Sequence, residues 1–368
     1  MNKISNSVLA VIMSCCALAL CGGNLLILKA FEPTALTAGI RQLVLGIAVA
    51  GVICFSGHDW LRKIAPILTG ILLAGLFLCP VFGYRLNGAT RWFKISGIDF
   101  YFSPALLAMP VLCLLWALVL KKFPEGLGRK QQFYLLGITL LAAGSIFIEP
   151  FISMAGFVVL LGMILFCLSG CGYKKAMICA WLFLGVAAVF TIGPAEYDPL
   201  QKQKDFYSCL FAPDYNKQYH VWSLATTLKH AVFYGRHQVP AEPKYHIPNS
   251  CTDSALAAVC GEYGYGFLIA ALLLMLGVIV CGAVIAKRCK DPAERLLAGG
   301  MTAVIGLPAL VNTLMMPGVL LPGSVSFPFL ALGGTAALGN ALALGCILSA
   351  AKRNAGEGKG EHLPESSC

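Results

Sequence analysis

The feature that most constrains this chain is a series of ten apolar runs, most of them about 20 residues long. They cover residues 8–28, 36–56, 64–83, 102–120, 131–149, 151–168, 174–193, 254–286, 294–320 and 325–350. A helix needs roughly 20 apolar residues to cross a bilayer, because each residue adds only about 1.5 Å. Charged residues make up 12% of the chain, against about 25% in soluble domains. The sequence therefore predicts an all-α polytopic membrane protein with about ten transmembrane helices.

The basic residues predict the orientation of these helices. Lys and Arg gather in short loops on the cytoplasmic side of a membrane. With the N-terminus inside, 16 of the 27 basic residues lie on the cytoplasmic side. We therefore expect a multi-pass protein of the cytoplasmic membrane with both termini in the cytoplasm. These anchors account for most of the net charge of +10, so no nucleic-acid partner is indicated.

No internal repeat and no separate soluble domain interrupts the apolar runs, so residues 1–368 are predicted to form one transmembrane domain. Its polar parts are a long extracytoplasmic loop at 194–253, between helices 7 and 8, and a cytoplasmic tail at 351–368. Within the loop, Val221, Leu224 and Leu228 recur near a helical period, which predicts an amphipathic helix on the outer membrane surface. Cys209 and Cys251 share this loop, and whether they pair stays open.

Two acids stand in or beside the eighth apolar run. Asp253 is predicted at its outer mouth, where it could cap the helix or act as a general base. In a continuous helix, Glu262 would lie roughly 13 Å deeper on nearly the opposite face, so the two acids do not form one catalytic pair. We interpret Glu262 as an intramembrane carboxylate with a structural or conformational role. Gly264 beside it would let a neighbouring helix approach closely.

Two further stretches could face the outer side. Arg85, Arg91 and Lys94 follow the third run, where they could bind phosphate or reach toward lipid headgroups. Between the ninth and tenth runs, the chain cannot form a regular span because of Pro317, Gly318, Pro322, Gly323 and Pro328. Irregular backbone at membrane depth occurs where it lines a cavity. Gly333 and Gly334 then suit close packing or a backbone approach to a ligand.

Motifs of soluble enzymes are missing from the sequence. It contains no phosphate-binding glycine loop of the GxxxxGK[ST] type, no HExxH and no paired CxxC. The six histidines have no metal-ligand spacing within one helix. A bound structural metal is therefore not predicted, and metal ligands are unknown.

Three stretches together resemble the SEDS family (shape, elongation, division and sporulation), the polytopic proteins typified by RodA, FtsW and SpoVE. NGATRWFKISGIDF at 87–100 resembles that family's NGARRWIxLGxFxF. IPNSCTDSALAAVCGEYG at 247–264 resembles LPExHTDFIFAVIAEELG, and VNTLMMPGVLLPGSVSFPFLALGG at 311–334 resembles INIGVVTGLLPTTGLPLPFISYGG. The chain departs from the family at FYFSPALLAM, where QPSELAK would stand, and at EPFISMA, where the Asp of EPDFGTA is lost.

The resemblance implies a peptidoglycan glycosyltransferase that polymerises lipid II on the outer face of the bacterial cytoplasmic membrane, in cell elongation or division. By position, Asp253 matches the family's essential acid, which is expected to deprotonate the acceptor sugar hydroxyl. Substrate binding is expected from Arg91, Lys94, Thr252, Arg236 and Asn312. Structural or conformational roles are expected from Glu262, Gly264, Pro328, Gly333 and Gly334.

The resemblance implies no tightly bound cofactor, although a divalent cation (Mg²⁺ or Mn²⁺) would suit the pyrophosphate. The expected partners are lipid II, undecaprenyl-linked glycan, membrane lipids and a class B penicillin-binding transpeptidase. Two alternatives remain open. One is a lipid II flippase or transporter, which would want acids near the midplane; the other is a non-catalytic membrane scaffold for the transpeptidase.

Overall fold

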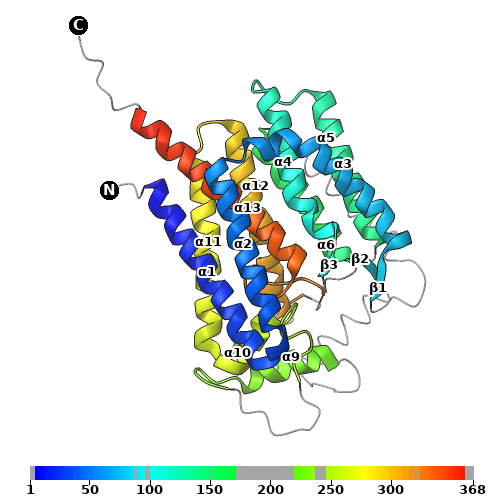
Figure 1. Cartoon of the computed structure of the whole chain (residues 1–368), viewed down its shortest axis with the longest axis vertical. Coiled ribbons are helices and arrows are strands. Elements are labelled where there is room, and N and C mark those ends of the chain that lie inside the picture. Colours follow the sequence, from blue (N-terminus) through cyan, green and yellow to red (C-terminus); the bar gives the residue numbers. More distant parts are fainter. Residues whose placement is uncertain are drawn as a thin grey trace.

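The computed structural model describes residues 5–86, 89–95, 100–149, 151–170, 219–236, 246–317, 319–320 and 323–360. These residues form a bundle of long helices with a small sheet and two short helices near one end (Figure 1). The long helices are α1 (Asn6–Phe31), α2 (Leu36–Ser56), α3 (Asp59–Phe82), α4 (Ala105–Lys122), α5 (Arg129–Ile148), α6 (Ile152–Leu168), α11 (Tyr265–Arg288), α12 (Pro292–Met315) and α13 (Gly334–Gly360).

The prediction of a polytopic helical membrane protein is confirmed. Among the described residues, eight helices are long and apolar enough to cross a membrane, and α6 is an apolar helix of 17 residues. Nine of the ten predicted runs coincide with helices, whereas the seventh, 174–193, lies outside the described residues.

Helix α4 lies at the centre of the bundle, where it contacts α3, α12 and α13. Its residues from Met109 to Ala117 are all buried, and Trp116 is fully enclosed. The indole Nε1 of Trp116 donates to Thr139 Oγ1 on α5 at 3.2 Å, because a buried indole N–H needs a partner. The family stretch QPSELAK carries a Glu and a Lys where this chain has FYFSPALLAM. The apolar residues that replace them suit the densely packed surroundings of α4.

The predicted continuous helix over 254–286 is wrong, because the chain breaks it into α10 (Ala255–Tyr263) and α11 at Gly264. Gly264 has φ +90°, and a Cβ there would lie 2.6 Å from the carbonyl oxygen of Val232. The same segment caps α11: Val232 O accepts from Tyr265 N, and Phe233 O accepts from Gly266 N, both at 2.9 Å. The break is thus stabilised by carbonyl groups that approach from a distant part of the sequence.

Two other connections also differ from the predicted runs. After α3, strands β1 (Tyr84–Leu86), β2 (Ala89–Ile95) and β3 (Phe100–Phe102) form an antiparallel sheet in the order β1-β2-β3. Helix α12 ends at Met315 and α13 begins at Gly334, so the predicted ninth and tenth runs extended too far into the connection. The irregular segment that the prolines predicted there is confirmed.

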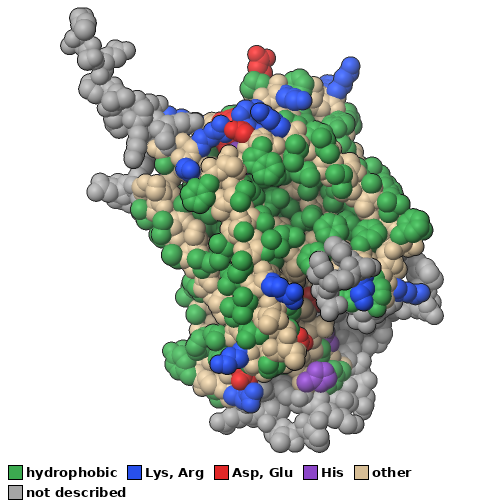
Figure 2. Space-filling model, in the orientation of Figure 1, with side chains coloured by type: hydrophobic (Ala, Val, Ile, Leu, Met, Phe, Trp, Pro, Cys, Tyr) green, Lys and Arg blue, Asp and Glu red, His purple; other side chains and the backbone are tan. Residues whose placement is uncertain are grey.

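The two ends of the bundle differ in structure. The start of α1 and the end of α13 lie at one end, and α10 and helix α9 (Tyr219–His230) lie at the other (Figure 1). Figure 2 shows mainly hydrophobic side chains across the broad middle of one face, with charged side chains near its upper edge and in its lower third. We call the end that carries α9 and α10 the Asp253 end.

Candidate active site

Asp253 lies in a tight turn at residues 248–254, directly before α10. The turn is closed by Asn249, whose φ is 53° and whose carbonyl oxygen accepts from Thr252 N and Ser254 N, both at 3.0 Å. The N-cap of α10 is Ser254 rather than Asp253. Asp253 therefore belongs to the turn and is not the residue at the N-cap of α10.

Helix α12 holds the turn through the side chain of Asn312. Asn312 Nδ2 donates to the carbonyl oxygens of Asp253 at 2.8 Å and Val325 at 2.5 Å. Asn312, predicted to bind substrate, is only 3% exposed, and its amide group instead joins two backbone segments. The carbonyl oxygen of Cys251 also accepts from Leu332 N at 2.7 Å. Two separate parts of the chain thus fix the backbone on which Asp253 stands.

A small cavity of about 20 Å³ adjoins this turn, lined by His220, Leu224, Asp253, Ser254, Asn312 and Gly323 among others. A space of this size holds about one water molecule. Burial raises the pKa of Asp253 to about 6, and the positive charge of Arg91 acts in the opposite direction. At neutral pH the carboxylate is therefore mostly ionised, with a pKa close enough to neutrality to accept a proton efficiently.

Arg91 is brought to the site by strand β2. Its Nε donates to the carbonyl oxygen of Glu149 at 3.1 Å, and its guanidinium carbon lies 4.6 Å from the centre of the Phe151 ring. Its Nη1 donates to Ser324 Oγ at 3.5 Å, which links β2 to the segment between α12 and α13. The positive charge of Arg91 acts on the pKa of Asp253, so the predicted base and the predicted phosphate ligand interact electrostatically.

Lys94, the other predicted phosphate ligand of β2, does not lie on the same face of the sheet as Arg91. Successive side chains of a strand point to opposite faces, so residues three apart on β2 face opposite ways. The Lys94 ammonium group lies 5.6 Å from the Tyr84 ring centre and 5.8 Å from that of Tyr101. Aromatic rings of β1 and β3 therefore hold Lys94 on the other face of the sheet.

Glu149 is a second acid near the site that the sequence reasoning did not assign to it. It follows α5, it is 0% exposed, and neither carboxyl oxygen has a hydrogen-bond partner among the residues that the structure describes. Burial raises its pKa to about 8, although the Arg91 charge lowers it. The signal in the sequence was an acid between two apolar runs, in the stretch IFIEPF.

Glu262 lies near the end of α10, ahead of the long apolar helix α11, because the helix breaks at Gly264. Its Oε2 accepts from Arg236 Nε at 2.7 Å, and the Arg236 side chain is 69% exposed. The pair joins the segment after α9 to the end of α10. The two predicted residues thus meet each other at the surface of the Asp253 end.

The remaining predicted residues shape the backbone around the site. Gly333 N donates to Gln42 Oε1 at 2.9 Å, and a Cβ on Gly334 would lie 2.3 Å from the Phe100 ring. Pro328 lies in the same irregular segment, and Thr252 Oγ1 donates to Asn249 O at 3.4 Å within the turn. Cys251 is buried with a free thiol, while Cys209 lies outside the described residues.

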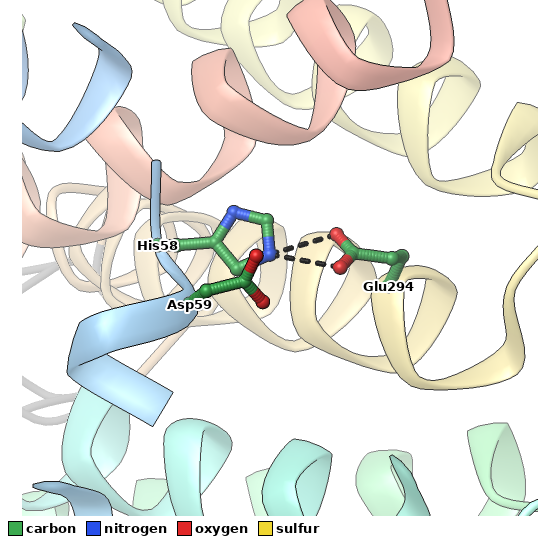
Figure 3. A group of neighbouring side chains, drawn as sticks. All are labelled: His58, Asp59 and Glu294. Carbon is green, nitrogen blue, oxygen red and sulfur yellow. Dashed lines mark hydrogen bonds and ion pairs between the residues drawn. The ribbon is translucent and has the colours of Figure 1, made fainter. Parts of the chain in front are cut away.

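Within the described part of the chain, one group of side chains has the composition of a metal site, and it lies far from Asp253. It consists of His58, Asp59 and Glu294 (Figure 3). His58 Nε2 contacts Glu294 Oε2 at 2.8 Å, and Arg353 binds both carboxylates at 2.8 and 2.9 Å. Arg62 also contacts both acids. Because two guanidinium groups already neutralise the carboxylates, the group is an ion-pair cluster poorly suited to a cation.

A larger cavity, of about 290 Å³, lies between α1, α2 and α13. Its lining is mostly apolar and includes Ala17, Leu43 and Ala341. It contains neither Asp253 nor Arg91, so the chemistry of the candidate site does not extend into it.

The comparisons with known proteins agree with this architecture. Residues 8–356 match the model of a family described as cell cycle protein, that of FtsW, RodA and SpoVE. The chain is similar to the probable peptidoglycan glycosyltransferase FtsW of Caulobacter vibrioides, with 22% identity over 285 residues, 77% of this chain and 71% of the relative. For the protein of the same name in Bacillus subtilis, the values are 24% over 304 residues, 76% and 70%.

Two solved structures share the fold. A chain of a peptidoglycan synthase complex has a TM-score of 0.72 at 20% identity, covering 93% of this chain and 97% of that one. The rod shape determining protein RodA of Thermus thermophilus has a TM-score of 0.68 at 20% identity, covering 93% and 96%. The helical bundle and its order of elements are thus those of proteins already known in three dimensions.

Proposed function

This chain belongs to the cell cycle protein family of FtsW, RodA and SpoVE, and on that premise we propose that it is a peptidoglycan glycosyltransferase. Its substrate would be lipid II, polymerised into glycan strands on the outer face of the cytoplasmic membrane. The observation that carries the proposal is Asp253, a partly buried acid in a turn fixed by Asn312, with Arg91 close by. The relatives from Caulobacter and Bacillus carry this activity in their names.

In the proposed reaction, Asp253 accepts the proton of a sugar hydroxyl on the acceptor lipid II. The oxygen attacks the anomeric carbon of the growing chain, and the bond from that carbon to the pyrophosphate breaks. Undecaprenyl pyrophosphate leaves with the bonding electron pair. Arg91 offers positive charge beside Asp253, which would stabilise the phosphate group that gains charge.

A divalent cation would fit this site only when it binds together with the pyrophosphate of the substrate. Mg²⁺ is commonly held by one or two carboxylates together with substrate phosphates, and Asp253 is the acid that lines the cavity. Mg²⁺ or Mn²⁺ would neutralise charge on the leaving pyrophosphate. Asp253 could contact such an ion, while Arg91 would remain the protein's own contribution.

We further propose that the Asp253 end faces outward and both termini are cytoplasmic. The connections at the opposite end carry the basic residues Arg62, Lys121, Arg288, Arg295 and Arg353, as the cytoplasmic side of membrane proteins does. The similarity to a chain of a peptidoglycan synthase complex supports a class B penicillin-binding transpeptidase as partner.

The transporter alternative receives less support. It required acids near the midplane of the membrane, and Glu262 was the candidate. Within the described spanning helices, the acids lie at the ends, as Asp59 and Glu294 do, and Glu262 precedes α11.

The test is polymerisation of purified lipid II by the protein, alone and with its cognate transpeptidase. We expect the wild type to form glycan strands and Asp253→Ala to form none. Glu125→Ala, which removes an exposed acid between α4 and α5, is the matched control and should retain full activity. Polymerisation by Asp253→Ala would exclude the proposed mechanism, whereas inactivity of the wild type in both settings would favour transport or scaffolding.

A further inference from the structure

Helix α9 brings a histidine into the cavity beside Asp253. His220 lies in the first turn of α9 and lines the same cavity as Asp253, Ser254 and Asn312. The neighbouring side chains Ser223, Leu224 and Thr227 are buried, so this face of α9 packs against the protein. The imidazole therefore closes one side of the space in which the acid stands.

His220 contacts the residue that follows the acid. Its Nε2 lies 3.1 Å from Ser254 Oγ, within hydrogen-bonding distance. Ser254 occupies the N-cap of α10, yet its side chain makes no capping hydrogen bond. A serine at this position ordinarily accepts from the N–H groups of the first turn. Here its hydroxyl is directed to the imidazole instead.

The imidazole is suited to this contact because it is uncharged at neutral pH. Burial lowers the pKa of His220 below its ordinary value. A neutral imidazole can donate from one nitrogen and accept with the other, and it brings no positive charge that would pair with Asp253. Among the described residues, the titratable groups that line the cavity are Asp253 and His220, and the charge of Arg91 acts on Asp253 from β2.

Helix α9 is held in place by other contacts. Tyr219 Oη and Ser223 Oγ donate to the carbonyl oxygen of His246 at 2.8 and 2.7 Å. At the other end of the helix, Tyr265 Oη donates to Leu228 O. A change at His220 therefore leaves α9 attached at both ends, and its effects can be read at the Asp253 turn.

We propose that His220 is a positioning residue for glycosyl transfer, which holds Ser254 and so fixes the direction of the Asp253 carboxylate and limits the access of water to it. The inference rests on the proposed function. The two backbone clamps from Asn312 and Leu332 hold the turn from the bundle side. Among the described residues, His220 adds a side-chain contact to the turn from helix α9.

The experiment compares His220→Ala, His220→Gln, Ser254→Ala and the double variant His220→Ala with Ser254→Ala in lipid II polymerisation. Misplacement of a reacting group by about 1 Å can cost about a hundredfold in rate. We expect His220→Ala to lower kcat by about tenfold to a hundredfold, with a smaller change in KM. Ser254→Ala should produce a similar loss, and the double variant should lose no more than either single one.

Two readouts separate positioning from loss of folding. Removal of the imidazole admits water to Asp253, so the acid limb of the pH–rate profile should move below about pH 6 in His220→Ala. Simple unfolding lowers the rate at every pH without moving the limb. His220→Gln, whose amide can still reach Ser254, should recover most of the rate. His230→Ala is the matched control, because the hydrogen bond that His230 Nδ1 makes among the described residues is with Thr226 O of its own helix.

Wild-type kcat and an unmoved acid limb in His220→Ala would overturn the inference, as would additive losses in the double variant. In either case an active wild type and an inactive Asp253→Ala would leave the proposed function intact. If the wild type forms no polymer, both the function and this role of His220 fall together.

Discussion

At the scale of single residues, the site contains two acids with raised pKa values that share one arginine. Burial raises the pKa of Asp253 to about 6 and that of Glu149 to about 8, and Arg91 opposes both shifts. At pH 7 the first is mostly ionised and the second mostly protonated. Two carboxyl groups with separated pKa values in one site often have different roles. Asp253 can accept a proton, whereas a neutral Glu149 adds no negative charge beside Arg91.

The state of Glu149 predicts a pH-dependent stability. Its pKa in the folded protein, about 8, lies above its ordinary value of about 4.3. Between these values the folded state binds more protons than the unfolded state, so Glu149 makes the protein less stable as pH rises. Glu149→Gln should melt close to the wild type at pH 4, where the carboxyl is largely protonated in both states, and at a higher temperature at pH 8.5.

Thermal unfolding in nanodiscs at both pH values would measure this difference. Glu125→Gln, which changes an exposed acid, should match the wild type at each pH. A Glu149→Gln variant that is equally stable or less stable at pH 8.5 would mean that the buried carboxyl has a partner which compensates its charge.

At the scale of elements, the junction of α10 and α11 determines where the acids lie. The loop after α9 caps α11 and leaves no room for a side chain at Gly264. We expect Gly264→Ala to destabilise the protein by at least about 1–3 kcal/mol, since it forces a non-glycine residue to positive φ and drives a Cβ into two carbonyl oxygens. The control is Gly137→Ala on α5, where a Cβ meets nothing within 4 Å.

The measurement is again thermal unfolding, together with the polymerisation rate. Gly137→Ala should be neutral or slightly stabilising, because alanine favours helix. If Gly264→Ala were as stable as Gly137→Ala, the close approach of the 232–233 carbonyl groups to α11 would not exist in the protein.

The same junction shows which elements the sequence predicts and which it does not. Apolar runs located nearly all the described helices, and prolines located the irregular segment before Gly334. The break at Gly264 was missed because its cause, the carbonyl groups of Val232 and Phe233, lies 32 and 31 residues away in sequence. Asp253 and Arg91 were predicted as site residues from local motifs. The roles of Glu149, Asn312 and His220 depend on burial and on contacts that only the tertiary structure creates.

At the scale of the whole molecule, the candidate site and the ion-pair cluster stand at opposite ends of the bundle. The cluster joins the starts of α3 and α12 to the end of α13 through Glu294, which is 5% exposed. His58 completes it by contacting Glu294 with one ring nitrogen and Ser349 with the other. A buried group of this kind stabilises the fold only while it is complete.

Removal of Glu294 should therefore affect stability rather than catalysis. Glu294→Ala leaves Arg62, which is 3% exposed, without one of its partners, and loss of one member of a buried pair costs about 3–5 kcal/mol. Lys121→Ala, which removes a more exposed member of the cluster, should cost less than about 1 kcal/mol. Polymerisation per folded molecule should stay at the wild-type value in both. A loss of polymerisation rate in folded Glu294→Ala would instead show that the ion-pair cluster and the Asp253 end are coupled.

The most direct test of the central claim is the pH dependence of lipid II polymerisation by wild type and Asp253→Asn, measured as initial rates from pH 5 to 8. Asp253 must be ionised to accept the proton, so the wild-type rate should rise with pH through about 6, where its raised pKa lies. Asp253→Asn, which keeps the shape of the side chain but cannot be ionised, should be inactive across the range. Activity of Asp253→Asn with the same acid limb would contradict the assignment, because the titrating base would then be another group.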